Sequence, residues 1–203
     1  MARTSRNNMK DSSFFHIMVQ GISKEYIFAT QKNKREYLKL IDINSKDIQM
    51  IAYCIMDNHA HILIQADRIK DIETWMKKSN VSYAIYYNKI NNRVGYVFRN
   101  RYKAQAIKNE KHLYLCIDYI HNNPVKAKIC KSKEKYIFSS YTQIYQGNQI
   151  KLQKMVEKML ERCITQTEDK ANDIEEFKLE EDEKENKEEI CKEVVKSFLE
   201  DKK

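Results

Sequence analysis

The chain has 203 residues, of which only three are glycine and one is proline. So few turn-forming residues argue against a β-sandwich or barrel with many tight turns, and no apolar run approaches the roughly 20 residues that a membrane helix needs. Five cysteines without a Cys-x-x-Cys pair exclude a disulfide framework and a zinc knuckle. We therefore expect a cytoplasmic protein with reduced thiols and no membrane association.

The net charge of +8 conceals two regions of opposite sign. Residues 161–203 contain 9 basic and 16 acidic side chains, whereas residues 1–160 contain 28 basic and 13 acidic ones. A body this basic, with interleaved tyrosines, favours a nucleic-acid partner, although surface lysines alone would give a similar charge. We predict one domain over residues 1–150 and a Glu/Lys-rich acidic tail over 151–203 that is either helical or disordered.

The predicted elements alternate between strand and helix. In chain order they are a strand at 13–20, a helix at 32–43, a hairpin at 47–65, a helix at 71–91, a short strand within 96–107 and a helix at 110–123. The first strand ends at Gly21 and contains His16, which we interpret as a packed histidine. The last helix should stop before Pro124, and residues 136–141 should pack back on the body. This order predicts an α+β fold: a ferredoxin-like antiparallel sheet with helices packed on one face.

The hairpin carries two histidines separated by one residue. Because alternate side chains of a strand share a face, His59 and His61 point the same way, whereas Ala60, Ile62 and Ile64 point towards a core. Neutral imidazole is a common ligand for divalent metals, so the two rings could hold one ion. A histidine pair alone is more often incidental, and its place at the rim of a predicted sheet is what favours a metal site.

Basic and aromatic residues interleave before the last helix. Arg99, Arg101, Tyr102 and Lys103 lie in this segment. The pattern suits a groove that neutralises phosphates and stacks bases, and it suits an ordinary edge strand with solvated charges equally well.

The last helix contains Tyr119, with Asn123 one turn further on. Residues four apart are neighbours on a helix, so the two side chains should lie together. With 13 tyrosines in the chain, spacing alone does not identify a nucleophile.

Two motifs together resemble the HUH single-tyrosine transposases of insertion sequences, and in particular their REP-associated tyrosine transposase branch. Residues 56–64 read Met-Asp-Asn-His-Ala-His-Ile-Leu-Ile, and residues 119–127 read Tyr-Ile-His-Asn-Asn-Pro-Val-Lys-Ala. With weaker matches elsewhere, the resemblance covers about residues 9–145. The family usually has proline where Asp57 stands, a departure in the turn that leaves the histidines intact.

The resemblance implies an HUH nuclease fold and a role for each matching residue. His59 and His61 would be ligands of Mg²⁺ or Mn²⁺, Tyr119 the nucleophile, and Asn123 a polar third ligand, where some relatives have glutamine. It implies a DNA transposase that cleaves single-stranded DNA near hairpins through a 5′-phosphotyrosine intermediate and rejoins strands. Whether the chain acts as a monomer or as a homodimer that exchanges tyrosine helices stays open.

Two other functions are compatible with the sequence. A hairpin DNA- or RNA-binding protein domesticated from such an enzyme would keep the fold without cleavage. A metal-dependent nuclease that activates water would cut without a covalent adduct, and Tyr119 would then be structural. The acidic tail is either a solubilising extension or an electrostatic shield over the basic body.

Overall fold

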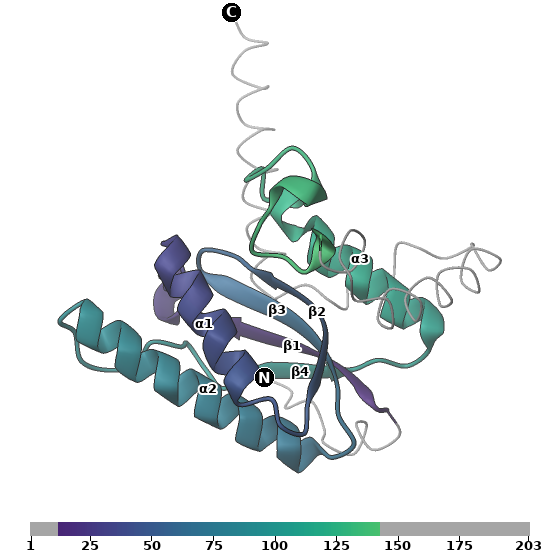
Figure 1. Cartoon of the computed structure of the whole chain (residues 1–203), viewed down its shortest axis with the longest axis horizontal. Coiled ribbons are helices and arrows are strands. Elements are labelled where there is room, and N and C mark those ends of the chain that lie inside the picture. The colour runs from purple at the N-terminus through teal and green to yellow at the C-terminus, as the bar shows by residue number, and fades with distance from the viewer. Residues whose placement is uncertain (1–11, 143–203) are drawn as a thin grey trace, which may run out of the picture. The chain divides into compact units, whose positions relative to one another are not determined.

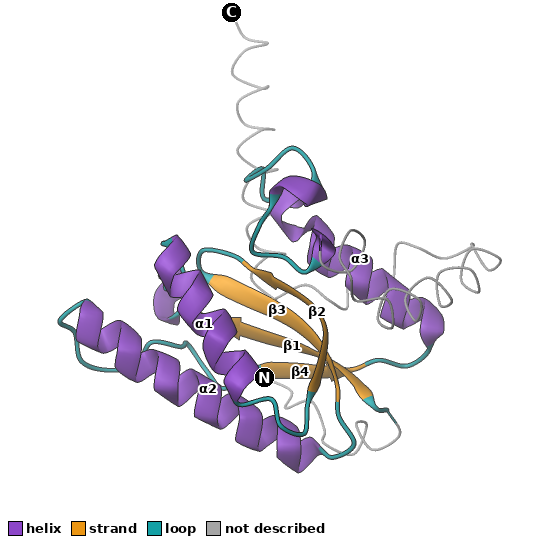
Figure 2. Cartoon of the chain, viewed as in Figure 1, coloured by secondary structure: helices purple, strands orange, loops and turns teal. Residues whose placement is uncertain are grey.

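The computed structural model of the protein describes residues 12–142, which contain a four-stranded sheet and three α-helices (Figures 1 and 2). The elements are β1 (Phe14–Gln20), α1 (Gln31–Ile43), β2 (Gln49–Ile55), β3 (His59–Gln65), α2 (Ile69–Ile90), β4 (Lys103–Ala106) and α3 (Glu110–Lys126). Each corresponds to an element predicted from the sequence. The predicted domain boundary at residue 150 and the tail lie outside the described residues.

The strand order in the sheet is β2-β3-β1-β4, and every neighbouring pair is antiparallel. β1, α1 and β2 therefore form one split βαβ unit, because β3 lies between the two strands, and β3, α2 and β4 form another around β1. This is the ferredoxin-like arrangement, so the predicted α+β antiparallel fold is confirmed.

Both faces of the central strands are covered. Residues 15–19 of β1 and 60–64 of β3 are all buried, and consecutive strand residues point to opposite faces. α3 contacts β2 and β3 on the face that carries the histidines, while α1 and α2 pack together on the other side of the sheet (Figure 1). The sequence predicted helices on one face of the sheet only. α1 and α2 cover that face, and α3 covers the opposite face as well.

α1 and α2 are held together by buried polar contacts as well as by packing. Trp75 donates its indole N–H to the Ile41 carbonyl at 2.8 Å, and the Tyr37 hydroxyl donates to Asn80 Oδ1 at 2.9 Å. Beside them lies a group of four rings, here called the aromatic cluster, whose centroids are 4.7–6.4 Å apart: Phe28, Tyr37, Tyr83 and Phe98. This packing holds α1 and α2 against the sheet, whose opposite face carries the histidines.

α3 continues past the proline that was expected to end it. Pro124 lies inside the helix, which runs to Lys126. Proline removes only its own N–H and disfavours helix at the preceding residue, and so close to the end one lost hydrogen bond does not stop the helix. The Ala127 N–H still donates to the Asn123 carbonyl at 2.9 Å.

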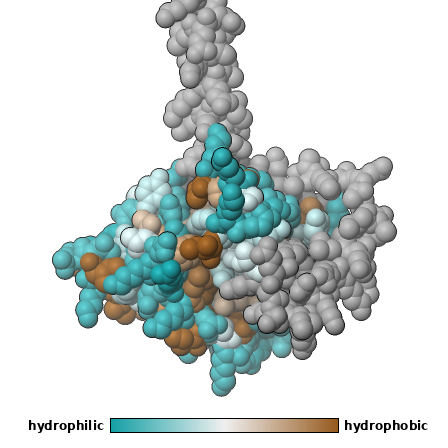
Figure 3. All heavy atoms as spheres, turned by 45° about the horizontal axis from the view of Figure 1, so that its top comes forward, coloured by the Kyte–Doolittle hydropathy of each residue, from teal (hydrophilic) through white to brown (hydrophobic). Residues whose placement is uncertain are grey.

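Residues 136–141 pack back on β2, as predicted. The Ile55 N–H donates to the Phe138 carbonyl at 2.9 Å, and the Tyr136 hydroxyl donates to the Ile55 carbonyl at 2.7 Å. None of the helices among residues 12–142 is long and apolar enough to cross a membrane. The face drawn in Figure 3 is mainly hydrophilic, with separate hydrophobic spots.

Candidate active site

The turn between β2 and β3 places the histidine pair. Three backbone hydrogen bonds hold it: from the Met56 N–H to the His59 carbonyl (2.9 Å), from the Phe28 N–H to the Asp57 carbonyl (2.7 Å) and from the Gly21 N–H to the Asn58 carbonyl (2.8 Å). Gly21 has no room for a side chain, because a Cβ there would lie 2.3 Å from the Glu25 carbonyl oxygen. The start of β3 is therefore fixed from both sides before any ligand arrives.

His59 and His61 lie on one face of β3, as predicted. Their ring centroids are 5.0 Å apart and the rings are nearly perpendicular, at 89°. His59 Nδ1 lies 2.6 Å from Asn58 Oδ1. Since an amide oxygen only accepts, His59 Nδ1 donates, and the lone pair of His59 is then on Nε2.

His61 is completely buried and stacks on a third histidine, His16 of β1. The two centroids are 5.1 Å apart with an interplanar angle of 20°, and His61 Nδ1 lies 3.0 Å from His16 Nε2. Burial is the main cause that lowers the pKa of His16 to about 3 and the pKa of His61 well below its usual value, so both rings are neutral near pH 7. Among residues 12–142, the buried Nε2 of His61 has no hydrogen-bond partner.

α3 brings Tyr119 against these rings. The centroid of Tyr119 lies 5.3 Å from that of His61, at 88°, and 6.1 Å from that of His16, at 76°. Tyr119 is only 4% exposed. His16, His59, His61 and Tyr119 are called the histidine cluster below. The structure thus brings the predicted nucleophile and the predicted histidine ligands together.

Asn123 and Lys126 flank Tyr119 on the same helix. Asn123 Nδ2 donates to the Tyr119 carbonyl at 3.0 Å, which fixes the orientation of the amide one turn beyond the tyrosine. Lys126 Nζ lies 5.0 Å from the centroid of the Tyr119 ring, within the range of a cation–π contact. The structure thus places a positive charge beside the phenol ring.

The basic segment approaches the same end of the sheet. The Arg99 N–H donates to the Gln20 carbonyl at 2.9 Å, and Gln20 is the β1 residue opposite His59. Lys103 pairs with Met18, which pairs with His61 on its other side, so Lys103 lies in the row of His61 on the same face. Arg101 is exposed and Tyr102 is half-buried.

Sequence reasoning missed three residues of this site. Asn58 was read only as part of a turn, His16 as a packed histidine and Lys126 as part of a motif. The position of Asn58 next to His59 was an available signal. The role of His16 depends on the β1–β3 register, which places two histidines diagonally across the strand pair and which no short motif encodes.

The residues present are compatible with a divalent cation. In the described part of the chain, no three histidine, cysteine or carboxylate side chains gather in a way that would hold a metal. The donors expected from the sequence are two imidazoles and the amide oxygen of Asn123. The buried His61 Nε2, which has no hydrogen bond among the described residues, is an atom for which a metal is a suitable partner. Nitrogen donors suit Mn²⁺ better than Mg²⁺, which prefers oxygen.

Comparison with known proteins adds independent information. The family model described as "Transposase IS200 like" matches residues 10–123. A protein of Haemophilus influenzae assigned to the REP-associated tyrosine transposases is 26% identical over 140 residues, which cover 63% of this chain and 78% of that protein. A solved structure of a REP-associated tyrosine transposase bound to a REP hairpin aligns with a TM-score of 0.56 at 17% identity, over 70% of this chain and 84% of the other. The structural likeness concerns the fold alone.

Proposed function

Because this chain belongs to the IS200-like transposase family, we propose that it is a single-tyrosine DNA transposase that cleaves single-stranded DNA through a 5′-phosphotyrosine intermediate. The family implies DNA cleavage and strand transfer. One observation supports the tyrosine mechanism: the ring centroids of Tyr119 and His61 are 5.3 Å apart, beside the pair of histidines on β3. A nucleophile next to a ligand pair is the arrangement that this chemistry needs.

The proposed reaction is an exchange of one ester bond for another. The Tyr119 oxygen attacks the phosphorus of a DNA phosphodiester, a P–O(tyrosine) bond forms and the bond from phosphorus to the 3′ oxygen breaks. The phenol loses its proton and the departing 3′ oxygen gains one. Because the link keeps the ester-bond energy, a 3′-hydroxyl can attack it in turn, which rejoins strands without a nucleotide cofactor.

His59, His61 and Asn123 are the proposed ligands of a divalent metal, Mg²⁺ or Mn²⁺. When bound, such an ion would neutralise and orient the phosphate under attack. The chain's own contribution is rigidity: Asn58 fixes the His59 ring, the Tyr119 carbonyl fixes the Asn123 amide, and α3 holds the phenol against His61. Groups held in this way lose little conformational freedom when DNA binds.

The proposed DNA-binding residues are Arg99, Arg101, Tyr102 and Lys103. Support comes from the backbone contact of Arg99 beside the His59 position and from the row that joins Lys103 to His61. Cations there would contact phosphates and Tyr102 could stack on a base. Phe98 is not proposed, because its ring packs in the aromatic cluster. A hairpin is the proposed form of the DNA, as in the relative solved with a REP hairpin.

A covalent-adduct assay tests the proposal. End-labelled single-stranded hairpin DNA from the flanks of the gene is incubated with Mn²⁺ and the protein, and denaturing gels are run for wild type, Tyr119→Phe and His61→Ala. We expect a protein–DNA adduct with wild type alone. Tyr83→Phe is the matched control, because it removes a hydroxyl from the aromatic cluster and should leave the adduct intact.

Other outcomes of this assay discriminate between functions. Cleavage without an adduct would overturn the tyrosine mechanism in favour of a nuclease that activates water. Binding that survives chelation and Tyr119→Phe, with no cleavage of any flank sequence, would favour a binding protein derived from a transposase.

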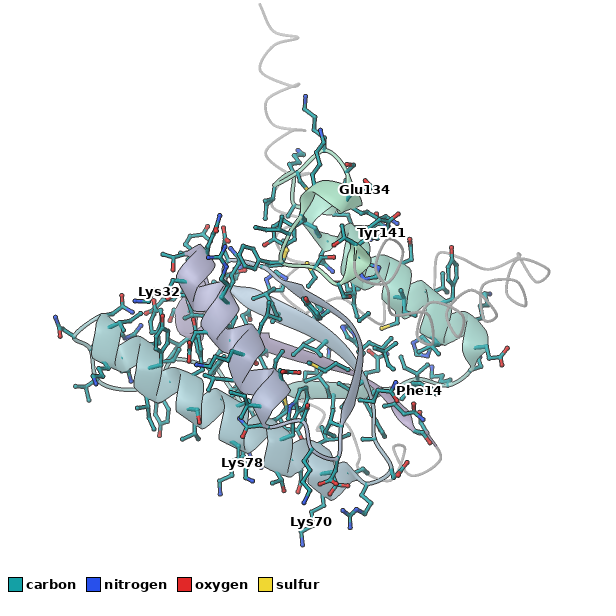
Figure 4. The ribbon with its side chains drawn as sticks, viewed as in Figure 1. Phe14, Lys32, Lys70, Lys78, Glu134 and Tyr141 are labelled. Atoms are coloured by element: carbon teal, nitrogen blue, oxygen red, sulfur yellow. The ribbon has the colours of Figure 1, made fainter. Side chains whose placement is uncertain are left out.

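Charge-matched variants test the DNA-binding segment. Arg99→Gln with Arg101→Gln should weaken binding of the hairpin and reduce the slope of log affinity against log salt by about 2. The control is Lys70→Gln with Lys78→Gln, two exposed cations that point away from the fold along α2 (Figure 4). Equal losses in both variants would show that the affinity comes from overall charge.

A further inference from the structure

We propose that His16 is a positioning residue that selects the metal-binding tautomer of His61 by accepting a hydrogen bond from His61 Nδ1. The inference rests on the proposed metal site and adds a role for a residue of β1 outside the ligand set. The observation that carries it is the 3.0 Å contact between His61 Nδ1 and His16 Nε2, two atoms of fully buried rings.

The contact allows only two proton arrangements. Either His61 Nδ1 carries the hydrogen and donates to His16 Nε2, or His16 Nε2 carries it and donates to His61 Nδ1. In the first arrangement His61 Nε2 has a lone pair available to a cation. In the second, His61 Nε2 carries a hydrogen and is unable to coordinate. Metal binding at His61 therefore requires His16 to be the acceptor.

The surrounding structure holds His16 in this position. In the β1–β3 register, His16 is opposite Leu63 and His61 is opposite Met18, so the two histidines are diagonal neighbours on one face. The two imidazole planes are 20° apart, and the Tyr119 ring lies nearly perpendicular to both of them. Both imidazoles are fully buried, which leaves little room for either ring to turn away from the other.

The same arrangement is present at the other histidine. Asn58 Oδ1 accepts from His59 Nδ1 at 2.6 Å, which leaves His59 Nε2 as the ligand atom. Ligand histidines commonly donate their second nitrogen to an acceptor, and loss of that acceptor typically lowers metal affinity 10- to 100-fold. His61 Nδ1 lies 3.0 Å from another imidazole, and this ring can take the acceptor role.

Two variants of His16 separate hydrogen bonding from packing. His16→Gln can place an amide oxygen near the position of Nε2 and keep an acceptor, whereas His16→Leu fills space without one. The dissociation constant for Mn²⁺ is measured on the full chain without DNA, by calorimetry or electron paramagnetic resonance. We expect His16→Leu to weaken Mn²⁺ binding 10- to 100-fold and His16→Gln to stay within about threefold of wild type.

The matched control is His121→Leu. His121 is also a buried histidine, but its Nε2 contacts the Ser140 hydroxyl at 2.9 Å and not the histidine cluster. This variant should lose stability and keep its affinity for Mn²⁺. If His121→Leu and His16→Leu weaken binding equally, the effect is structural and the proposal is wrong.

A spectroscopic readout does not need the metal or a folded variant. Nitrogen-15 NMR of metal-free wild type should show His61 protonated at Nδ1 and bare at Nε2. The opposite tautomer would overturn the proposal. Wild type that fails to bind Mn²⁺ would overturn both the metal site and the role of His16, whereas normal Mn²⁺ binding and adduct formation in His16→Leu would remove the role of His16 alone.

Discussion

Two buried groups of rings lie in this fold, and they differ in how completely their polar atoms are satisfied. In the aromatic cluster, the Tyr83 hydroxyl donates to the Ile27 carbonyl at 2.6 Å and the Tyr37 hydroxyl donates to Asn80 at 2.9 Å. In the histidine cluster, by contrast, His61 Nε2 is buried without a hydrogen bond from any residue between 12 and 142. Of the two clusters, only the histidine cluster has a buried polar atom without a hydrogen bond among the described residues.

This difference suggests that the aromatic cluster serves stability and that the histidine cluster serves the proposed function. A buried polar atom without a partner costs about 1–3 kcal/mol, so a nitrogen in that state reduces the stability of the metal-free chain. Such a cost is typical of functional sites, where a ligand later supplies the missing interaction. The aromatic cluster and the α1–α2 contacts contribute stability that offsets the cost of this buried nitrogen.

The largest expected effect comes from removing one hydroxyl from each cluster. Tyr119→Phe should abolish adduct formation, a loss of more than about 10³-fold, because the attacking oxygen is removed. Tyr83→Phe should keep the activity and lose about 1 kcal/mol of stability, since a buried hydrogen bond disappears. Adduct gels and urea denaturation measure both quantities. Loss of adduct formation in Tyr83→Phe would contradict the division between the clusters.

Metal should stabilise the protein through the histidine cluster. Mn²⁺ at 100 times its dissociation constant should add about 2.7 kcal/mol to the free energy of unfolding, provided that the unfolded chain does not bind it. The gain should be smaller for Mg²⁺ at the same concentration, absent in His61→Ala and retained in Tyr119→Phe. Thermal shifts with and without a chelator measure it, and a gain that survived His61→Ala would place the ion elsewhere.

Acid should destabilise the histidine-containing face before it affects the aromatic cluster. Burial lowers the pKa of His16 to about 3 and that of His121 to about 4, whereas burial raises the pKa values of Tyr37 and Tyr83. Between about pH 6.5 and pH 4 the unfolded chain therefore binds protons that the folded chain does not, and stability falls as the pH falls. We expect a loss of about 2 kcal/mol at pH 5 from each of His16 and His121.

Urea denaturation at pH 7 and pH 5 measures this loss, and His121→Gln is the control. The variant removes one titrating group and should show a shallower pH dependence. An unchanged slope would mean that His121 is not held neutral in the folded chain.

The sequence was sufficient for features that depend on local periodicity. The alternation of side chains along a strand predicted that His59 and His61 share one face, and in the structure both lie in β3 on the same face. The predicted end of α3 was wrong. The cost of a proline depends on how much helix follows it, and only two helical residues follow Pro124. His16 needed strand register, a long-range property that a single sequence does not reveal.

Lys34 is a second example of a residue that local patterns misplace. A lysine on an amphipathic helix is expected to be exposed, but the Lys34 side chain is only 7% exposed, and its Nζ lies 2.5 Å from Asp57 Oδ1 and 5.3 Å from the centroid of the Phe138 ring. A proline at position 57 could not form this ion pair. The ion pair between Lys34 and Asp57 therefore helps to hold the turn before His59.

The smallest expected effect comes from this ion pair. Asp57→Ala leaves the Lys34 ammonium buried without its carboxylate and should cost about 1–2 kcal/mol, less than a fully buried pair because Asp57 is 43% exposed. Lys34→Met removes the charge and keeps the apolar stem against Phe138, so it should cost less than about 1 kcal/mol. The double variant Asp57→Pro with Lys34→Met should be more stable than Asp57→Ala, because neither change leaves a buried charge. Urea denaturation ranks the three variants, and equal losses in Asp57→Ala and Lys34→Met would show that the turn is held by its backbone hydrogen bonds alone.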